Sequence, residues 1–210
     1  MKFLSFFVTS ILFSMTMVPI GAQAKNEGNP SKPPQVTGNH SIVINGTATM
    51  VGQWSCGGDV KVSTTPDPSE PPAPGLPTGV QVSAVTPVPA INCGDSKMNE
   101  HMQKALKEKE FPEIRFKTDK YNLIDNGKAV KTAGELTIAG VTKPVEIEAK
   151  LMPVPQGGTR VTGQINVDMA DFGVKPPSLF FGSMKVAKMV TIRFDTVVPP
   201  PNQVPQSLGQ

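Results

Sequence analysis

Few side chains in this chain belong to the types that carry catalysis or bind metals. Its 210 residues include two histidines, His40 and His101, and two cysteines, Cys56 and Cys93. No Gly-x-Ser-x-Gly motif is present, and no Cys-x-x-Cys or His-x-x-x-His spacing joins these residues. The sequence therefore predicts no catalytic residue, no metal and no cofactor. A hydrolase that uses His101 is the remaining enzymatic alternative.

The charged and aromatic residues also argue against acid–base catalysis and against a nucleic-acid-binding surface. Glu146 and Glu148 alternate with apolar residues, which places both on the outward face of a strand. The formal net charge of +3 falls by one, to +2, if residues 1–24 with Lys2 are removed. One Trp and one Tyr leave little for stacking on bases. We expect no nucleic-acid partner.

The first 24 residues, MKFLSFFVTSILFSMTMVPIGAQA, have the pattern of a secretory signal peptide. One Lys precedes an apolar run, and the small-x-small triplet that ends at Ala24 follows it. The alternative is a membrane anchor, but the apolar run is only marginally long for a span of about 20 residues. We expect cleavage after Ala24, a periplasmic or secreted location, and no membrane span in the mature chain.

Both cysteines lie beyond the predicted signal peptide, in a chain expected in an oxidising compartment. Pairing of Cys56 with Cys93 is therefore the natural prediction. Such a disulfide would stabilise the fold by roughly 4 kcal/mol in the chain-entropy model. Two buried free thiols remain the alternative, because the sequence does not show whether their Cβ atoms approach.

The composition along the chain indicates one domain with flexible ends. Residues 25–38 and 199–210 are polar and Pro-rich, and we expect both to be mobile. A third Pro-rich stretch, 64–79, contains six prolines and is expected to form a long exposed loop. The folded domain is then predicted to span residues 39–198.

Short alternating segments dominate this domain and predict an all-β fold. We expect an eight-stranded antiparallel barrel or sandwich. The predicted strands are 41–50, 59–64, 80–85, 113–121, 130–139, 144–152, 159–169 and 186–198. One segment, 96–112, instead has helical spacing, since Met98, Met102, Ala105 and Leu106 share a face. Its expected N-cap is Asp95, Ser96 or Asn99.

The stretch ELTIAGVTKPVEIEAKL, residues 135–151, predicts a hairpin with one buried face. Leu136 and Ile138 alternate with polar or small residues before the turn, and Val145 and Ile147 do so after it. Gly140 can adopt a positive φ, and a proline suits the first position of the returning strand. We therefore expect GVTKP to form the turn.

The hairpin GELTIAGVTKPVEI closely resembles the signature of the YceI-like family of secreted, lipocalin-like proteins. Other segments resemble the family in the same order: SIVINGTATMVGQW, CGDSKMNEHMQKALKEKEFPEIRF and MADFGVKPPSLFFGSMKVAKMVTIRF. The resemblance covers residues 40–198. It implies an eight-stranded lipocalin-like barrel with one short helix, and a long-chain lipid or polyisoprenoid as the partner.

An eight-stranded barrel is either filled by its own side chains or holds one elongated ligand. Apolar residues on the strands are candidates for the cavity wall, and those in the loop-like segment 171–184 are candidates for its entrance. These candidates are Ile44, Phe116, Leu136, Ile138, Val145, Ile147, Phe172, Phe180, Phe181, Met184 and Phe194. Polar candidates for contact with a head group are Asn99, His101, Gln103 and Lys185.

Two functions follow from these two possibilities. A hollow barrel would be a non-catalytic binding protein for a long-chain amphiphilic lipid, such as a polyisoprenoid, a fatty acid or an amide. A filled barrel would be a structural or protein-interaction module. Pairing of edge strands would allow a homodimer, although the sequence does not require one.

Overall fold

The computed structural model describes residues 41–66, 80–155, 157–179 and 183–200. The predicted signal peptide and the segment 25–38 lie outside the described residues, as do Phe180 and Phe181, the last ten residues of the tail, and residues 67–79 of the Pro-rich loop. Among the described residues no helix is long and apolar enough to cross a membrane.

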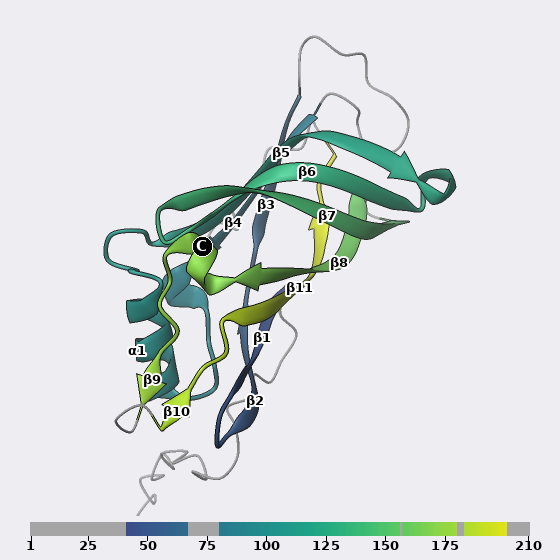
Figure 1. Ribbon diagram of the computed structural model, residues 1–210. Coiled ribbons are helices and arrows are strands. Elements are labelled where there is room, and N and C mark those ends of the chain that lie inside the picture. The colour runs from purple at the N-terminus through teal and green to yellow at the C-terminus, as the bar shows by residue number, and fades with distance from the viewer. Residues whose placement is uncertain (1–40, 67–79, 156, 180–182, 201–210) are drawn as a thin grey trace, which may run out of the picture.

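The domain consists of one antiparallel sheet, curled into a half-barrel, and one α-helix (Figure 1). Nine strands pair in the order β2-β1-β11-β8-β7-β6-β5-β4-β3. They are β1 (Ile42–Ala48), β2 (Gly52–Gly58), β3 (Lys61–Pro66), β4 (Val80–Pro87), β5 (Glu113–Ile124), β6 (Ala129–Ile138), β7 (Val141–Pro153), β8 (Thr159–Asp168) and β11 (Met189–Val198). The predicted all-β fold with one helix between strands is confirmed.

The remaining elements are short. A separate pair is formed by β9 (Ser178–Leu179) and β10 (Met184–Lys185). Three 3-10 turns complete the described part: η1 (Val88–Ala90), η2 (Asp125–Gly127) and η3 (Met169–Phe172).

The main sheet has one strand more than the eight predicted, because residues 52–58 form β2. The sequence GQWSCGG lacks the alternation and β-branched residues that mark a strand, so the prediction missed it. Only Asp59 and Val60 separate β2 from β3, and these two strands occupy the opposite ends of the strand order. Counted as one bent strand, β2 and β3 join the two edges of the sheet and give the eight strands of a barrel.

The Pro-rich loop begins later than predicted. Residues 64–66 belong to β3, where they pair with residues 80–82 of β4. The hydroxyl of Thr64 also donates a hydrogen bond to the carbonyl oxygen of Pro199, at 3.5 Å. This bond brings the end of β3 beside the chain that leaves β11.

The predicted helix is confirmed as α1, Ser96–Ala105, but it is shorter than the predicted segment 96–112, because residues 106–110 form turns. Asp95 is its N-cap, since the carboxylate accepts a hydrogen bond of 2.8 Å from the backbone N–H of Met98. Its apolar residues Met98, Met102 and Ala105, together with Leu106 at the C-cap, pack against the buried core. The helix thereby covers one end of the curled sheet, on the same side as β9 and β10 (Figure 1).

The hairpin of β6 and β7 is confirmed, but its turn is tighter than expected. Ile138 pairs with Val141, so the turn consists of Ala139 and Gly140, with φ angles of 49° and 81°. Two residues with positive φ match the twist of the flanking strands, as in a type I′ turn. Pro144 therefore lies inside β7, opposite Glu135. This is tolerated because β7 does not begin to pair with β8 until Ala149.

The interior is packed unevenly along the barrel. A contiguous core near α1 consists of buried side chains from the barrel and from the segments that flank it: Trp54, Cys56, Ile91, Cys93, Leu136, Ile138, Ala139, Val167, Phe172, Val174 and Val190. No residue of α1 lines the open space found in the other half of the barrel. The barrel is therefore filled at the helix end and hollow beyond it.

Candidate functional site

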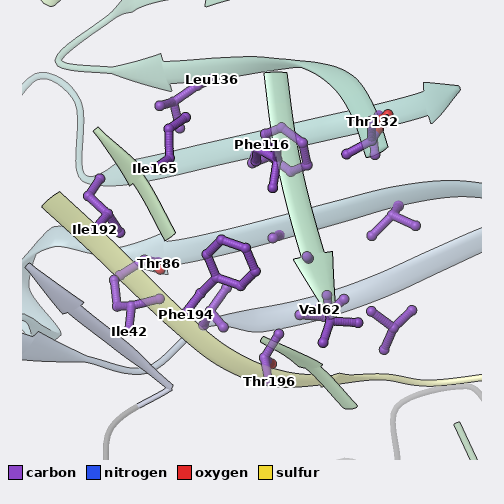
Figure 2. Close-up of a pocket in the computed structure, with 18 of the residues that line it drawn as sticks. Ile42, Val62, Thr86, Phe116, Thr132, Leu136, Ile165, Ile192, Phe194 and Thr196 are labelled. Carbon is purple, nitrogen blue, oxygen red and sulfur yellow. Dashed lines mark hydrogen bonds between the residues drawn. The ribbon is translucent and has the colours of Figure 1, made fainter. Parts of the chain in front are cut away.

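A cavity of about 190 Å³ occupies the hollow half of the barrel (Figure 2). Every strand of the main sheet except β2 contributes to its wall. Its lining residues are Ile42, Ile44, Val60, Val62, Val82, Ala84, Thr86, Ile114, Phe116, Thr118, Tyr121, Val130, Thr132, Leu136, Ile147, Ala149, Val161, Ile165, Ile192, Phe194, Thr196 and Val198. Val82 lies near the start of β4 and Val198 is the last residue of β11, both at strand ends distant from α1, so the cavity reaches the rim opposite the helix.

Strand alternation explains which side chains form the wall. On β11 four alternate residues from Ile192 to Val198 face the cavity, and the intervening Arg193, Asp195 and Val197 are exposed. On β5 the even-numbered residues face the cavity up to Thr118, and this alternation is then interrupted, because the register with β6 shifts between Lys117 and Lys120. This bulge brings Tyr121 onto the same face as Phe116 and Thr118.

The wall is almost entirely apolar. Among the described residues that line it, none carries a charge, and the polar ones are four threonines and Tyr121. The hydroxyl oxygens of Thr118 and Thr132 lie 2.7 Å apart, and both are buried. The Thr132 hydroxyl donates to the carbonyl oxygen of Lys120 at 2.7 Å, and that of Thr118 lies 2.9 Å from the carbonyl oxygen of Ala133. These two hydroxyls use their hydrogens within the wall.

The outer face of the same strands carries the charges. Arg160 on β8 and Asp195 on β11 form a two-pronged ion pair with N–O distances of 2.6 and 2.5 Å. This hydrogen bond lowers the pKa of Asp195, and the carboxylate raises that of Arg160. Both side chains are about half exposed, so the pair belongs to the surface and not to the cavity.

The predicted disulfide is confirmed and holds the closed end of the barrel together. Cys56 on β2 and Cys93, just before α1, are joined by an S–S bond of 2.05 Å and are fully buried. Beside them the backbones of Gly57 and Asn92 exchange two hydrogen bonds of 2.8 Å. The side-chain oxygen of Asn99 accepts a bond of 2.7 Å from the backbone N–H of Cys93. The segment that leads into α1 is thus tied to β2.

The structure brings together five of the residues predicted from sequence for the cavity: Ile44, Phe116, Leu136, Ile147 and Phe194. The other two strand residues, Ile138 and Val145, belong to or pack against the filled core and do not line the cavity. The prediction from alternation identified the inward face, but it did not indicate how far along each strand the core extends.

The described residues of the loop segment predicted as the entrance, Phe172 and Met184, do not line the cavity. Phe172 is only 3% exposed and lies in the filled core, and Met184 is in β10. The expected head-group contacts Asn99, His101 and Gln103 are on α1, and Lys185 is on β10, at the end distant from the hollow half. Phe172 and Val174 of this loop belong to the filled core at the helix end.

Sequence reasoning missed the polar part of the wall. Four threonines occupy positions of their strands that alternate with outward-facing residues: Thr86, Thr118, Thr132 and Thr196. The alternation of the strands could therefore have identified them. Alternation could not have identified Tyr121, because the direction of its side chain depends on the bulge in β5.

An antiparallel sheet curled around an apolar cavity, with one end closed by a helix, defines a lipocalin-like barrel. The YceI-like domain model matches residues 34–198. The chain therefore belongs to the YceI-like domain family.

One protein of similar sequence and one solved structure of similar fold are as follows. A UPF0312 protein of Vibrio parahaemolyticus is 25% identical over 178 residues, which cover 81% of this chain and 88% of that protein. The crystal structure of Burkholderia cenocepacia BcnA is similar with a TM-score of 0.59 and 17% identity, over 75% of this chain and 96% of that one.

A polyisoprenoid binding domain from Saccharophagus degradans, implicated in plant cell wall breakdown, is similar with a TM-score of 0.54. Its identity is 12%, and the match covers 76% of this chain and 94% of that domain. At these identities the two solved structures support the fold.

Proposed function

We propose that this chain is a secreted or periplasmic binding protein that holds the hydrocarbon chain of an amphiphilic lipid inside its barrel, without catalysis. The observation that carries the proposal is the cavity wall, which is apolar and free of charged side chains over its described residues. A wall of this kind favours the transfer of hydrocarbon from water and offers no partner for an ionised group.

The size of the cavity suits a segment of hydrocarbon. In another protein an apolar cavity of roughly 150 Å³ stays dry and takes up benzene. Each buried methylene contributes about 0.8 kcal/mol, whereas association costs roughly 4 to 15 kcal/mol. Long prenyl or acyl chains are therefore better ligands than short ones.

The polar head group of such a lipid stays at the rim. The cavity reaches the strand ends opposite α1, where Val82 and Val198 are among its lining residues. A chain that enters from this rim leaves its head group in solvent and needs no buried ion pair. A polyisoprenoid, a fatty acid and a fatty amide all fit this description, and the polyisoprenoid binding domain of similar fold supports the first of them.

The location outside the cytoplasm rests on the N-terminal sequence pattern, with its cleavage expected after Ala24. The buried disulfide is consistent with an oxidising compartment. N-terminal sequencing of the protein from a fractionated host would test both the cleavage site and the compartment.

Native mass spectrometry of protein purified from its own host, followed by lipid extraction, tests the binding function. We expect a bound long-chain lipid, and we expect geranylgeraniol or hexadecanol to bind protein from which that lipid has been extracted. A chain that carries no lipid and binds neither probe would refute the proposal and favour a structural module.

A variant that fills the cavity tests the location of the ligand. Ala149 is buried and lines the wall, so Ala149→Leu adds three carbon atoms to the cavity and is expected to weaken hexadecanol binding at least about tenfold. The neighbouring Lys150 is exposed, and Lys150→Leu is the matched control with unchanged affinity. Equal affinity of Ala149→Leu and wild type, measured by calorimetric titration, would place the ligand elsewhere.

A further inference from the structure

Three aromatic rings inside the barrel lie directly against glycines of the neighbouring strand. A Cβ atom built on Gly163 would lie 2.5 Å from the ring of Phe194, and one on Gly134 would lie 2.5 Å from the ring of Phe116. The third pair is Gly46 with Trp54, at 2.3 Å. No side chain larger than that of glycine fits beneath any of these rings while they keep their positions.

Two of the three pairs border the cavity, and the third does not. Phe116 and Phe194 are lining residues of the same cavity (Figure 2), whereas Trp54 belongs to the filled core. The two phenylalanines come from β5 and β11. Between these strands lie β6, β7 and β8 on one side, and β1, β4 and the bent strand of β2 and β3 on the other. The rings therefore belong to opposite walls.

Each glycine determines how far its ring projects into the cavity. Phe194 pairs directly with Gly163 across β11 and β8, so the ring covers the place where a side chain of β8 would stand. Because the sheet lies behind the ring, a methyl group at position 163 can displace it only toward the cavity. Phe116 pairs with Leu136 and its ring lies diagonally over Gly134, so a methyl group at position 134 would also displace that ring, while it would meet the carbonyl oxygen of Lys117 at 2.6 Å.

We infer that Gly163 and Gly134 are specificity-determining residues, which hold Phe194 and Phe116 against opposite walls and so keep the cavity wide enough for a long hydrocarbon chain. This inference rests on the proposed lipid-binding function. According to this inference, the width of the cavity is controlled by two glycines that are not among its lining residues.

A double-mutant cycle on Gly163 and Phe194 tests the inference, with hexadecanol and the shorter decanol as probes. Gly163→Ala is expected to weaken hexadecanol binding about tenfold, as if the displaced ring excluded about two methylenes. In the Phe194→Leu background the same glycine change is expected to alter affinity less than about twofold, because the ring is gone. The loss for decanol is expected to be smaller than that for hexadecanol.

The cycle separates a change in cavity width from general damage to the fold. A Cβ atom at position 163 would also lie 2.9 Å from the carbonyl oxygen of Glu148, so some loss of stability is expected in both backgrounds. Gly46→Ala is the control, because it disturbs an equivalent ring contact outside the cavity. Its stability should fall while the affinity of the folded protein stays unchanged.

The outcomes distinguish this inference from the function on which it rests. Failure of the wild-type protein to bind either probe would refute lipid binding itself. Binding by wild type with an equal loss from Gly163→Ala in both backgrounds would refute the role of the ring. Unchanged affinity of Gly163→Ala for hexadecanol would refute it as well.

Discussion

Thr118 and Thr132 show how single polar residues are accommodated in an apolar wall. Their buried hydroxyl oxygens lie 2.7 Å apart and within hydrogen-bond distance of the carbonyl oxygens of Lys120 and Ala133, next to the bulge in β5, so both hydroxyl hydrogens have acceptors within the wall. Their methyl groups are the remaining part that a ligand can contact. The two threonines therefore stabilise an irregular strand without offering a ligand a free donor.

Replacement of Thr132 by valine separates these two roles. Thr132→Val removes the donor to the carbonyl oxygen of Lys120, and we expect the free energy of unfolding to fall by about 1 to 2 kcal/mol. Hexadecanol affinity should stay the same or rise, because the wall becomes more apolar. Urea denaturation and calorimetric titration measure the two quantities.

Thr191→Val is the matched control for this change. The Thr191 hydroxyl donates to the side-chain oxygen of Asn166 on the exposed face of the sheet, at 2.8 Å. Its replacement is expected to cost less than about 0.5 kcal/mol. An equal loss of stability in both variants would show that the buried hydrogen bond of Thr132 contributes no more to stability than the exposed one of Thr191.

At the scale of elements, α1 and its leading segment close the barrel. Apolar residues of the helix pack on the core, and the disulfide ties the segment before the helix to β2. The N-cap at Asp95 sets where the helix begins. The cavity lies away from this closed end, since no residue of α1 lines it.

Removal of the disulfide is expected to destabilise the whole fold. The double variant Cys56→Ala, Cys93→Ala should lose roughly 4 kcal/mol in the chain-entropy model, since the bond spans a sequence separation of 37. Alanine is preferred to serine because both positions are fully buried. The expected loss is measured by chemical denaturation without reductant.

A reductant provides the control for this prediction. Dithiothreitol should lower the stability of the wild-type protein toward that of the double variant and leave the variant unchanged. If wild type and the double variant unfold at the same denaturant concentration without reductant, the bond does not contribute to stability as proposed.

At the scale of the molecule, the filled half and the hollow half share the same long strands. Leu136 belongs to the buried core and also lines the cavity, and Ile44, Phe116 and Ile192 pack against that core while lining the cavity. A domain of this size built on one continuous sheet is expected to unfold as one unit. Binding in the hollow half should therefore stabilise the filled half as well.

This linkage gives a quantitative prediction for the intact protein. Hexadecanol at a free concentration of 100 times its dissociation constant should stabilise the folded state by about 2.7 kcal/mol. Differential scanning calorimetry should show one transition that moves to higher temperature. Two transitions, of which the ligand moves only one, would mean that the halves unfold independently.

The sequence alone was sufficient for the type of fold and for most of its elements. Alternation depends on the local geometry of a strand, in which successive side chains point to opposite faces, so the strands rich in β-branched residues were identified. The helix was predicted with its cap at Asp95 among the alternatives, because helical spacing and capping are also local. The pairing of Cys56 with Cys93 followed from the expected compartment and is present in the structure.

Local patterns did not identify every element or every direction of a side chain. The strand β2 is rich in glycine and is held by its pairing with β1 along its whole length, which is a long-range effect. The turn at Ala139 and Gly140 depends on the register of the two strands. Likewise, Tyr121 faces the cavity because of a bulge that is defined by the partner strand.

Whether the barrel is filled or hollow was decided by the tertiary structure alone. An apolar residue that packs in a core and one that lines a cavity follow the same alternation, so Ile138 and Ile147 look alike in the sequence. The structure places Ile138 in the core near α1 and Ile147 at the cavity. The difference depends on the volume of the side chains that meet from distant strands, which only the tertiary structure brings together.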